Sequence, residues 1–212
     1  MYVNDKTMIK NLIFDFGNVL VNVDSHSVLK HYFKDDGEAE KRFRAILGSP
    51  EFVEACDRGL LSFDELIQEA QAGNPHFAGA FRFFHENYPD EVTGEIEGMR
   101  NLLAGLKTKG FKLYGLSNWS GEVYEVMRRY EIFELLDGQV ISCEEHLVKP
   151  EREIYLRLCG RYGLTPSECL FTDDKPENVE GAKAAGMNAV LFTTPENYAA
   201  DIERLCTEYL RR

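Results

Sequence analysis

Short apolar runs of the length of a β-strand recur along the chain, and each of them ends in polar residues. The run at residues 9–14 stops at Asp15, and the run at residues 111–116 stops at Ser117. Apolar runs of this length, bounded by polar or turn residues, predict strands that are buried on both faces. The other runs are residues 169–171 and 188–192, with a weaker candidate at residues 139–141.

Amphipathic helices are predicted in the intervals between these runs. Pro150 and Pro176 stand where two such helices would begin, because proline suits the first helical position. Strand and helix therefore alternate through residues 95–212, which predicts a parallel sheet covered on both faces. Apolar residues recur at helical spacing over residues 96–106, 154–162 and 179–185.

Residues 23–94 show a different pattern and contain no convincing strand. Ser62 and Glu65 form a capping box, and Pro75 opens a further helix with an apolar face at residues 77–88. We expect a helical insertion after the first strand, which places it above the carboxyl ends of the strands, where open α/β sheets bind ligands. The expected division is an α/β core of residues 1–22 and 95–212 and a helical cap of residues 23–94.

Composition limits the classes of partner. With 24 Lys and Arg against 36 Asp and Glu, the 212-residue chain carries a net charge of -12, which repels the backbone of nucleic acids. The same charge would also repel a small anionic substrate. The five cysteines are odd in number and form no Cys-x-x-Cys pair, which is typical of a reduced, cytoplasmic protein. Neither a secretion signal nor a membrane span is expected, and no feature predicts the oligomeric state.

The residues at the strand ends carry the chemistry. Asp15, Ser117–Asn118 and Asp173–Asp174 each terminate a predicted strand, and Lys149 precedes a proline. If these strands are neighbours, their carboxyl ends bring the side chains into one crevice. Three carboxylates raise one another's pKa unless a cation lies between them, and hard oxygen ligands suit Mg²⁺. A lysine, a hydroxyl and backbone N–H groups beside such an ion suit a phosphoryl group.

These segments resemble the four motifs of the haloacid dehalogenase (HAD) superfamily, which consists mostly of Mg²⁺-dependent phosphatases. The resemblance covers nearly the whole chain. Residues 11–20 resemble the first motif, with Asp15 at the position of the nucleophile. Residues 116–118 resemble the second, in which Ser117 binds phosphoryl oxygens. Lys149-Pro150 resembles the third, in which the lysine neutralises nucleophile and phosphate. Residues 171–174, continuing to Asn178, resemble the fourth.

The resemblance implies a Rossmann-like parallel-sheet core with a helical cap, a bound Mg²⁺ ion and an aspartyl-phosphate intermediate on a small phosphate ester. It implies that Asp15, the backbone carbonyl of Gly17 and Asp174 bind the metal ion. Asp173 would either bind the ion as well or orient its ligands. A turn of the cap dips into the active site in this family, which makes Arg58 a candidate substrate contact. The implied catalytic residues are Asp15, Ser117 and Lys149, and the implied substrate-binding residues are Gly17, Arg58, Ser117, Asn118 and Lys149.

The first motif departs from the family pattern at Gly17, where family phosphatases usually have a second Asp that serves as general acid and then as base. Gly17-Asn18-Val19 resembles the branch containing bacterial α-glucose-1-phosphate phosphatases. Because an anomeric oxygen is a better leaving group than an ordinary alcohol, a sugar 1-phosphate depends less on general acid help, which is worth about 10² to 10⁴ in rate. Asp24, His26 or a substrate hydroxyl are candidates to replace the missing acid.

Two alternatives remain open at this stage. The first is a 2-haloacid dehalogenase, which also lacks the second Asp. Its chemistry needs no metal, so the pair Asp173–Asp174 argues against this alternative. A phosphometabolite-binding protein with weakened catalysis would also fit the glycine at position 17. Trp119 could equally stack on a sugar or pack at an interface, and Asn178 is expected to orient a neighbour at least as readily as to contact ligand.

Overall fold

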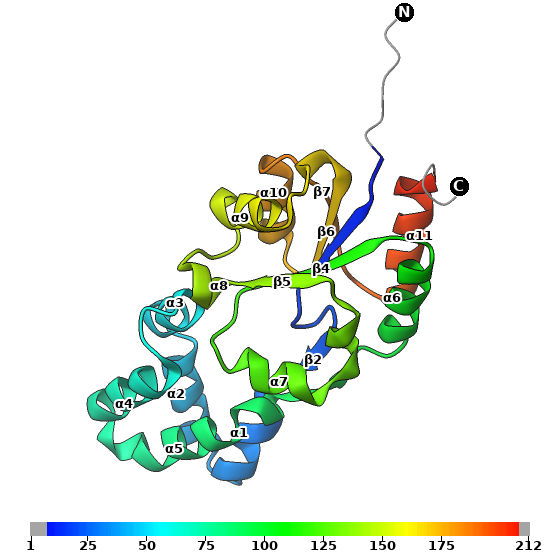
Figure 1. Ribbon diagram of the computed structural model, residues 1–212. Helices are drawn as coiled ribbons and strands as arrows, with labels where there is room; N and C mark the ends of the chain where they lie inside the picture. The colour runs from blue at the N-terminus through cyan, green and yellow to red at the C-terminus, as the bar shows by residue number, and fades with distance from the viewer. Residues whose placement is uncertain (1–7, 208–212) are drawn as a thin grey trace, which may run out of the picture.

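The centre of the molecule is a parallel sheet of five strands in the order β5-β4-β1-β6-β7, in a computed structural model that describes residues 8–207 (Figure 1). Each of the five apolar runs forms one of these strands, so the α/β prediction is confirmed. The strands are β1 (Asn11–Phe14), β4 (Lys112–Ser117), β5 (Gly138–Ile141), β6 (Cys169–Asp173) and β7 (Asn188–Leu191).

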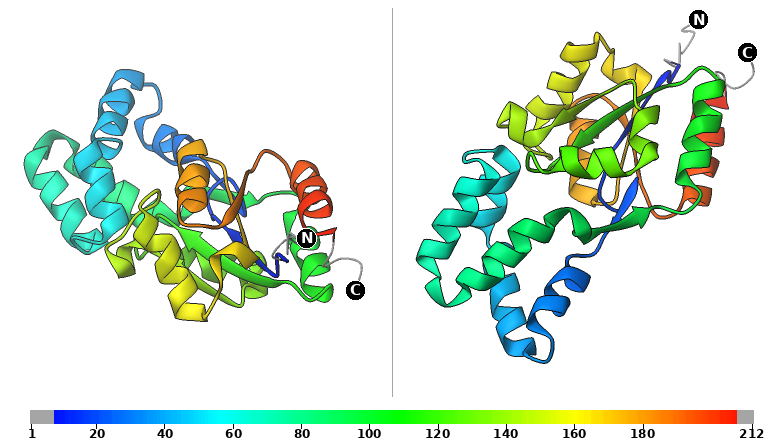
Figure 2. Two further views of the ribbon diagram at one scale, coloured as in Figure 1. Left: turned by 90° about the horizontal axis from the view of Figure 1, so that it is seen from above. Right: turned by 60° about the horizontal axis from the view of Figure 1, so that its bottom comes forward.

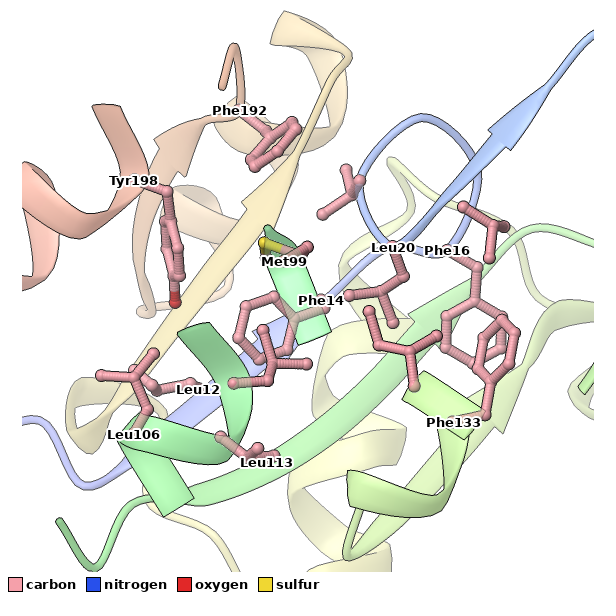
Figure 3. Close-up of a cluster of buried hydrophobic side chains, with 14 of the residues drawn as sticks. Leu12, Phe14, Phe16, Leu20, Met99, Leu106, Leu113, Phe133, Phe192 and Tyr198 are labelled. Atoms are coloured by element: carbon pink, nitrogen blue, oxygen red, sulfur yellow. The ribbon is translucent and has the colours of Figure 1, made fainter. Parts of the chain in front are cut away.

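Helices cover both faces of the sheet because side chains along each strand alternate between the faces. In β1, Leu12 and Phe14 belong to one hydrophobic cluster and Ile13 to another. Figure 3 shows the first cluster, where Met99, Leu106 and Tyr198 from the covering helices gather around Leu12 and Phe14 of β1. The helices on that face are α6 (Met99–Thr108), α7 (Val123–Arg129) and α11 (Pro195–Leu205), and those on the other are α9 (Arg152–Tyr162) and α10 (Pro176–Ala184).

The prolines mark helix starts with different accuracy. Pro176 is the first residue of α10, as its position in the sequence predicts. Pro150 instead lies two residues before Arg152, where α9 begins, and Glu151 occupies the position between them. No helix within residues 8–207 combines the length and the apolar character that crossing a membrane requires.

Five α-helices follow β1 and gather at one end of the molecule (Figure 2). Their aromatic residues pack around Phe43, which is fully buried and contacts the rings of Phe77, Phe81 and Phe84. The capping box of Ser62 and Glu65 is present at the start of the fourth helix. The helices are α1 (Ser25–Phe33), α2 (Gly37–Leu47), α3 (Pro50–Arg58), α4 (Phe63–Gly73) and α5 (Ala78–Asn87).

A second, two-stranded antiparallel sheet joins these helices to the core. It pairs β2 (Val21–Val23) with β3 (Val92–Glu95). The expectation that residues 23–94 contain no convincing strand was wrong at Val23 and at β3, because β3 is short, contains Gly94 and shows no alternation of apolar residues. Its strand conformation depends on pairing with a segment about seventy residues earlier, which local pattern does not reveal.

Gly115, in the inner strand β4, is required by close packing. A Cβ at this position would lie 2.6 Å from Cζ of Phe16, whose ring packs against Phe133. We expect Gly115→Ala to lower the free energy of unfolding by about 1–3 kcal/mol, since the ring of Phe16 would have to shift from its contact with Phe133. Gly105→Ala is the matched control, because its Cβ would meet nothing within 4 Å on the exposed face of α6. Urea unfolding that gives Gly115→Ala the midpoint of the wild type would contradict this packing.

Candidate active site

Three adjacent strands end at the same edge of the sheet, and their ends bring the predicted site residues together. The order β4-β1-β6 makes the strands neighbours, as the sequence interpretation required. Asp15 follows β1, Ser117 is the last residue of β4, and Asp173 is the last residue of β6. Carboxylate oxygens of Asp15, Asp173 and Asp174 all lie within 4.8 Å of one another.

Lys149 connects two of these carboxylates. Its Nζ lies 2.8 Å from Oδ1 of Asp15 and 2.6 Å from Oδ2 of Asp173, and its side chain is only 1% exposed. Burial alone would lower the pKa of Lys149, but the two carboxylates outweigh burial and leave it above its ordinary value. Burial raises the pKa of Asp15 despite the opposing charge of Lys149, and the charge of Asp173 adds to the increase. The lysine is therefore charged and fixed between its partners.

Asp15 presents its two oxygens differently. Oδ1 accepts hydrogen bonds from Oγ of Ser117 at 2.8 Å and from the backbone N–H of Phe16 at 2.7 Å, besides its contact with Lys149. Within residues 8–207, no donor bonds to Oδ2. The carboxylate is thus held through one oxygen, while the other is available for chemistry.

Asn118 fixes the backbone of Lys149. Its Oδ1 accepts from the N–H of Lys149 at 2.8 Å, and its Nδ2 donates to the carbonyl oxygen of Lys149 at 3.1 Å. Both polar atoms of the Asn118 amide are therefore engaged in positioning the lysine. Asn118 also lines the cavity over Asp15, so its contact with substrate stays a prediction.

The two acids at the end of β6 have different surroundings. Asp173 is fully buried and accepts from Nδ2 of Asn178 and from the N–H of Lys175, besides pairing with Lys149. Asn178 thus orients Asp173. Asp174 is half-buried, lines the cavity and forms no hydrogen bond or ion pair inside the described part of the chain. This makes Asp174 the carboxylate best placed to accept an external ligand.

The donor set fits a divalent metal ion. One lysine faces three carboxylates whose oxygens lie within 4.8 Å of one another, so the cluster carries an excess of negative charge. Oxygen ligands of this kind suit Mg²⁺, which takes one or two carboxylates together with water and phosphate oxygens. Gly17 lines the same cavity, which is compatible with a ligand role for its carbonyl. Asp15, Asp174 and Gly17 are the residues that could hold such an ion, with Asp173 beside them.

The cavity over Asp15 has a volume of about 220 Å³ and is closed in part by residues of the insertion and its junction. Sequence reasoning missed Asp57, Tyr88 and Glu91, which line it from that side. The one sequence signal for Asp57 was its position directly before Arg58, in the turn that was expected to reach the active site. The core residues around the cavity include Asp15, Gly17, Asn18, Ser117, Asn118, Trp119, Lys149, Asp174, Lys175 and Asn178.

Arg58 lies beside this cavity and joins α3 to the core. Its guanidinium pairs with Glu54 at 3.0 Å and with Glu151 at 2.5 Å, and it donates to the backbone oxygen of His146. Arg58 lines an adjoining cavity together with Lys149, and is not among the residues around the cavity over Asp15. Its role as a substrate contact stays a prediction.

Three further residues from the sequence interpretation have definite places. Asp24 caps α1 by accepting from the N–H of His26, and Nδ1 of His26 lies 2.8 Å from Oε1 of Glu40. Neither Asp24 nor His26 lines the cavity over Asp15. Trp119 does line it, although only 8% exposed and part of the core cluster, so both of its anticipated roles are compatible with its position.

A family model for haloacid dehalogenase-like hydrolases matches residues 9–186. The chain belongs to this family. It is 30% identical over 196 residues to the sesquiterpene phosphatase astK of Aspergillus oryzae, covering 88% of this chain and 91% of that one. It is 27% identical to a phosphorylated carbohydrates phosphatase of Thermotoga maritima, covering 84% and 82%. Flavin mononucleotide hydrolase 1 of Arabidopsis thaliana is 29% identical over 110 residues, which span 52% of this chain but only 45% of that relative.

The fold is shared with solved structures of the family. A HAD family enzyme from Bacteroides thetaiotaomicron, solved in complex with magnesium and inorganic phosphate, superposes with a TM-score of 0.73 at 21% identity, covering 91% of this chain and 98% of that one. The family match makes this chain a hydrolase, and the Aspergillus oryzae and Thermotoga maritima relatives are named as phosphatases of different substrates.

The acidic cluster predicts stabilisation by Mg²⁺. An ion that binds only the folded state at about 100 times its Kd adds roughly 2.7 kcal/mol to the free energy of unfolding. We expect Mg²⁺ to raise the Tm of the wild type, and Asp174→Asn to lose most of that increase because the unpaired ligand is removed. Asp201→Asn, in an exposed pair with Arg204, is the control and should keep the increase. An equal Mg²⁺-dependent shift in Asp174→Asn and wild type would argue against this site.

Proposed function

We propose that this chain is a Mg²⁺-dependent phosphatase that hydrolyses small phosphorylated metabolites through an aspartyl-phosphate on Asp15. The observation that carries the proposal is the arrangement around Asp15. Its Oδ1 is held by Ser117 and Lys149 at 2.8 Å each, while unpaired Asp174 lies beside it in a cavity. A dehalogenase would not need Asp174 and its neighbour, because its chemistry uses no metal.

The reaction follows from the positions of these groups. Oδ2 of Asp15 attacks phosphorus in line with the bond to the leaving oxygen, which breaks as the phosphoryl group moves to Asp15. Lys149 and Ser117 donate to the oxygens of the phosphoryl group, where negative charge develops. Water then hydrolyses the aspartyl-phosphate and restores Asp15. Mg²⁺ held by Asp15, Asp174 and the Gly17 carbonyl would supply charge neutralisation.

Sugar phosphates, and a sugar 1-phosphate first, are the substrates that the first motif favours. The segment Gly17-Asn18-Val19 resembles the α-glucose-1-phosphate phosphatase branch, and the Thermotoga maritima relative is named for phosphorylated carbohydrates. An anomeric leaving group suits a site whose usual acid position is glycine. Trp119, at the edge of the cavity, offers a ring on which a sugar face could stack.

A second substrate class is favoured by a cavity inside the insertion, which we call the cap cavity. This cavity of about 280 Å³ shares Asp57, Tyr88 and Glu91 with the cavity over Asp15, so the two adjoin at these residues. Its walls are largely apolar, with Arg44 as the cationic exception. A phosphate ester with an apolar or aromatic leaving group would fit it, and the Aspergillus oryzae relative is named a sesquiterpene phosphatase. The apolar wall residues are Leu29, Leu47, Phe52, Val53, Phe63 and Phe84.

Phosphate release by Asp15→Asn tests the proposed activity. With Mg²⁺ and a panel of sugar phosphates and prenyl or aryl phosphates, we expect the wild type to turn over at least one ester. Asp15→Asn should be at least about a thousandfold slower, because the nucleophile is lost. The panel includes 2-haloacids, and halide release without metal would favour a dehalogenase. Binding of an ester with no turnover above that of Asp15→Asn would favour a binding protein.

Leu47→Gln tests the assignment of the cap cavity. Placing an amide in the apolar wall should lower kcat/KM for an ester with an apolar leaving group by about 10- to 200-fold, the range for one hydrophobic contact in a pocket. Values for a sugar 1-phosphate should change little if it does not fill this cavity. Leu60→Gln, at an exposed position outside both cavities, is the matched control. If the two substitutions have equal effects on kcat/KM, the cap cavity does not select the leaving group.

A further inference from the structure

The loop after β1 offers no proton donor for a leaving group. Gly17 has no side chain, and a Cβ there would already lie 3.3 Å from Cγ2 of Val23. Asp24 and His26, the nearest acids and bases downstream, are engaged at the start of α1 and do not line the cavity over Asp15. A protein group that protonates the leaving oxygen must therefore come from another segment.

Asp57 and Glu91 are the remaining carboxyl groups around this cavity within residues 8–207. Their electrostatic neighbours differ. The charge of Asp57 interacts with Lys149, Lys175 and Asp15, which surround the expected phosphoryl position. The charge of Glu91 interacts with Arg44 and Asp24, on the side of the insertion. Of the two carboxyl groups, Asp57 is therefore the one whose charge interacts with Asp15 and Lys149.

Asp57 also lies between the two cavities. It lines both the cavity over Asp15 and the cap cavity. A phosphoryl group in the first and its leaving group in the second would place the ester oxygen near their junction. Across the described residues, the Asp57 carboxyl forms no hydrogen bond or ion pair, so it is free to exchange a proton with substrate or water.

The residues after Asp57 anchor it to the core. Arg58 pairs with Glu151 and donates to the backbone of His146, whose Nδ1 in turn lies 2.7 Å from the carbonyl oxygen of Arg58. Gly59 has a positive φ of 59°, and a Cβ there would lie 2.9 Å from Cβ of Cys143 and overlap its carbonyl oxygen. The end of α3 thus packs closely against the core, and this contact fixes Asp57 over the site.

We propose that Asp57 is the general acid and base of the reaction, an inference that rests on the proposed phosphatase function. As Asp15 attacks phosphorus and the P–O bond breaks, the Asp57 carboxyl gives its proton to the leaving oxygen, which departs as an alcohol. The resulting Asp57 carboxylate then takes a proton from the water that attacks the aspartyl-phosphate. Inorganic phosphate leaves, and both Asp15 and protonated Asp57 are restored.

The titration of Asp57 suits both roles. Burial raises its pKa to about 6, against the lowering effect of Lys175 and Lys149 and with a further increase from Asp15. A group with this pKa can donate and accept near neutral pH. Because the protonated form is the donor, bond cleavage should slow as pH rises through about 6. The titratable and charged groups around it are Asp15, Cys56, Tyr88, Glu91, Cys143, Lys149, Asp174 and Lys175.

The test compares leaving groups that do and do not need a proton. Mg²⁺-loaded wild type, Asp57→Asn, Asp57→Glu and Glu91→Gln are assayed with a primary alkyl phosphate and with p-nitrophenyl phosphate. Asp57→Asn should lower kcat for the alkyl ester by about 10² to 10⁴, and should lose the decline above about pH 6. With the aryl ester it should release a burst of about one p-nitrophenol per site before slow turnover. The first step is fast because p-nitrophenolate leaves without a proton, whereas hydrolysis of the aspartyl-phosphate is slow because the attacking water lacks its base. Asp57→Glu should restore part of the alkyl activity.

Other outcomes would overturn the assignment. Equal losses on both esters without a burst would mean that Asp57 acts only on binding or structure. A dependence on leaving group that appears in Glu91→Gln instead would transfer the role to Glu91. Glu51→Gln, an exposed carboxyl of the same helix, is the control for the lost charge. If Asp57→Asn does not fold, the pH profile and burst of Asp57→Glu decide. Failure of the wild type on both esters and on the whole panel of sugar, prenyl and aryl phosphates would instead contradict the proposed function itself.

Discussion

The buried ammonium group of Lys149 is the interaction on which the site depends. It lies between Asp15 and Asp173, and its charge opposes the effect of burial, which raises the pKa of Asp15. The rest of the site serves this contact. Asn118 fixes the lysine backbone, Asn178 and the N–H of Lys175 satisfy the remaining lone pairs of Asp173, and Ser117 holds Asp15. A buried ion pair is weak evidence for stability, but the hydrogen bonds around this one specify a single arrangement of the three strand ends.

Local and global charge point in different directions. The chain has a net charge of -12, which opposes the approach of any anion over long distances. Lys149 and Lys175 both line the cavity over Asp15, however, and a divalent ion on Asp174 would add two positive charges at the same place. Bound cations commonly reverse local electrostatics in this way. The acidic composition is therefore compatible with a site that binds a single phosphate ester.

The core and the insertion differ in how much of them the sequence predicts. Ile13 and Phe14 lie in a strand buried on both faces, so their apolar run and its polar end are visible locally, and the site at those ends follows from strand order. Val92 joins β3 only through pairing with β2, and Asp57 reaches the cavity only because α3 docks on the core. Neither position has a periodic signal, since tertiary contacts rather than propensity place them.

The anchoring of α3 connects substrate choice to proton transfer. Val53 and Cys56 line the cap cavity, and Asp57, one residue further along, lines both cavities. Under the assignment of Asp57 as acid and base, one short helix selects the leaving group and protonates its oxygen. A carboxyl on the loop after β1 would act on any ester that reaches Asp15. A carboxyl on α3 acts only when α3 is in contact with the core through Arg58 and Gly59. Proton transfer then depends on the same contact that encloses the substrate between insertion and core.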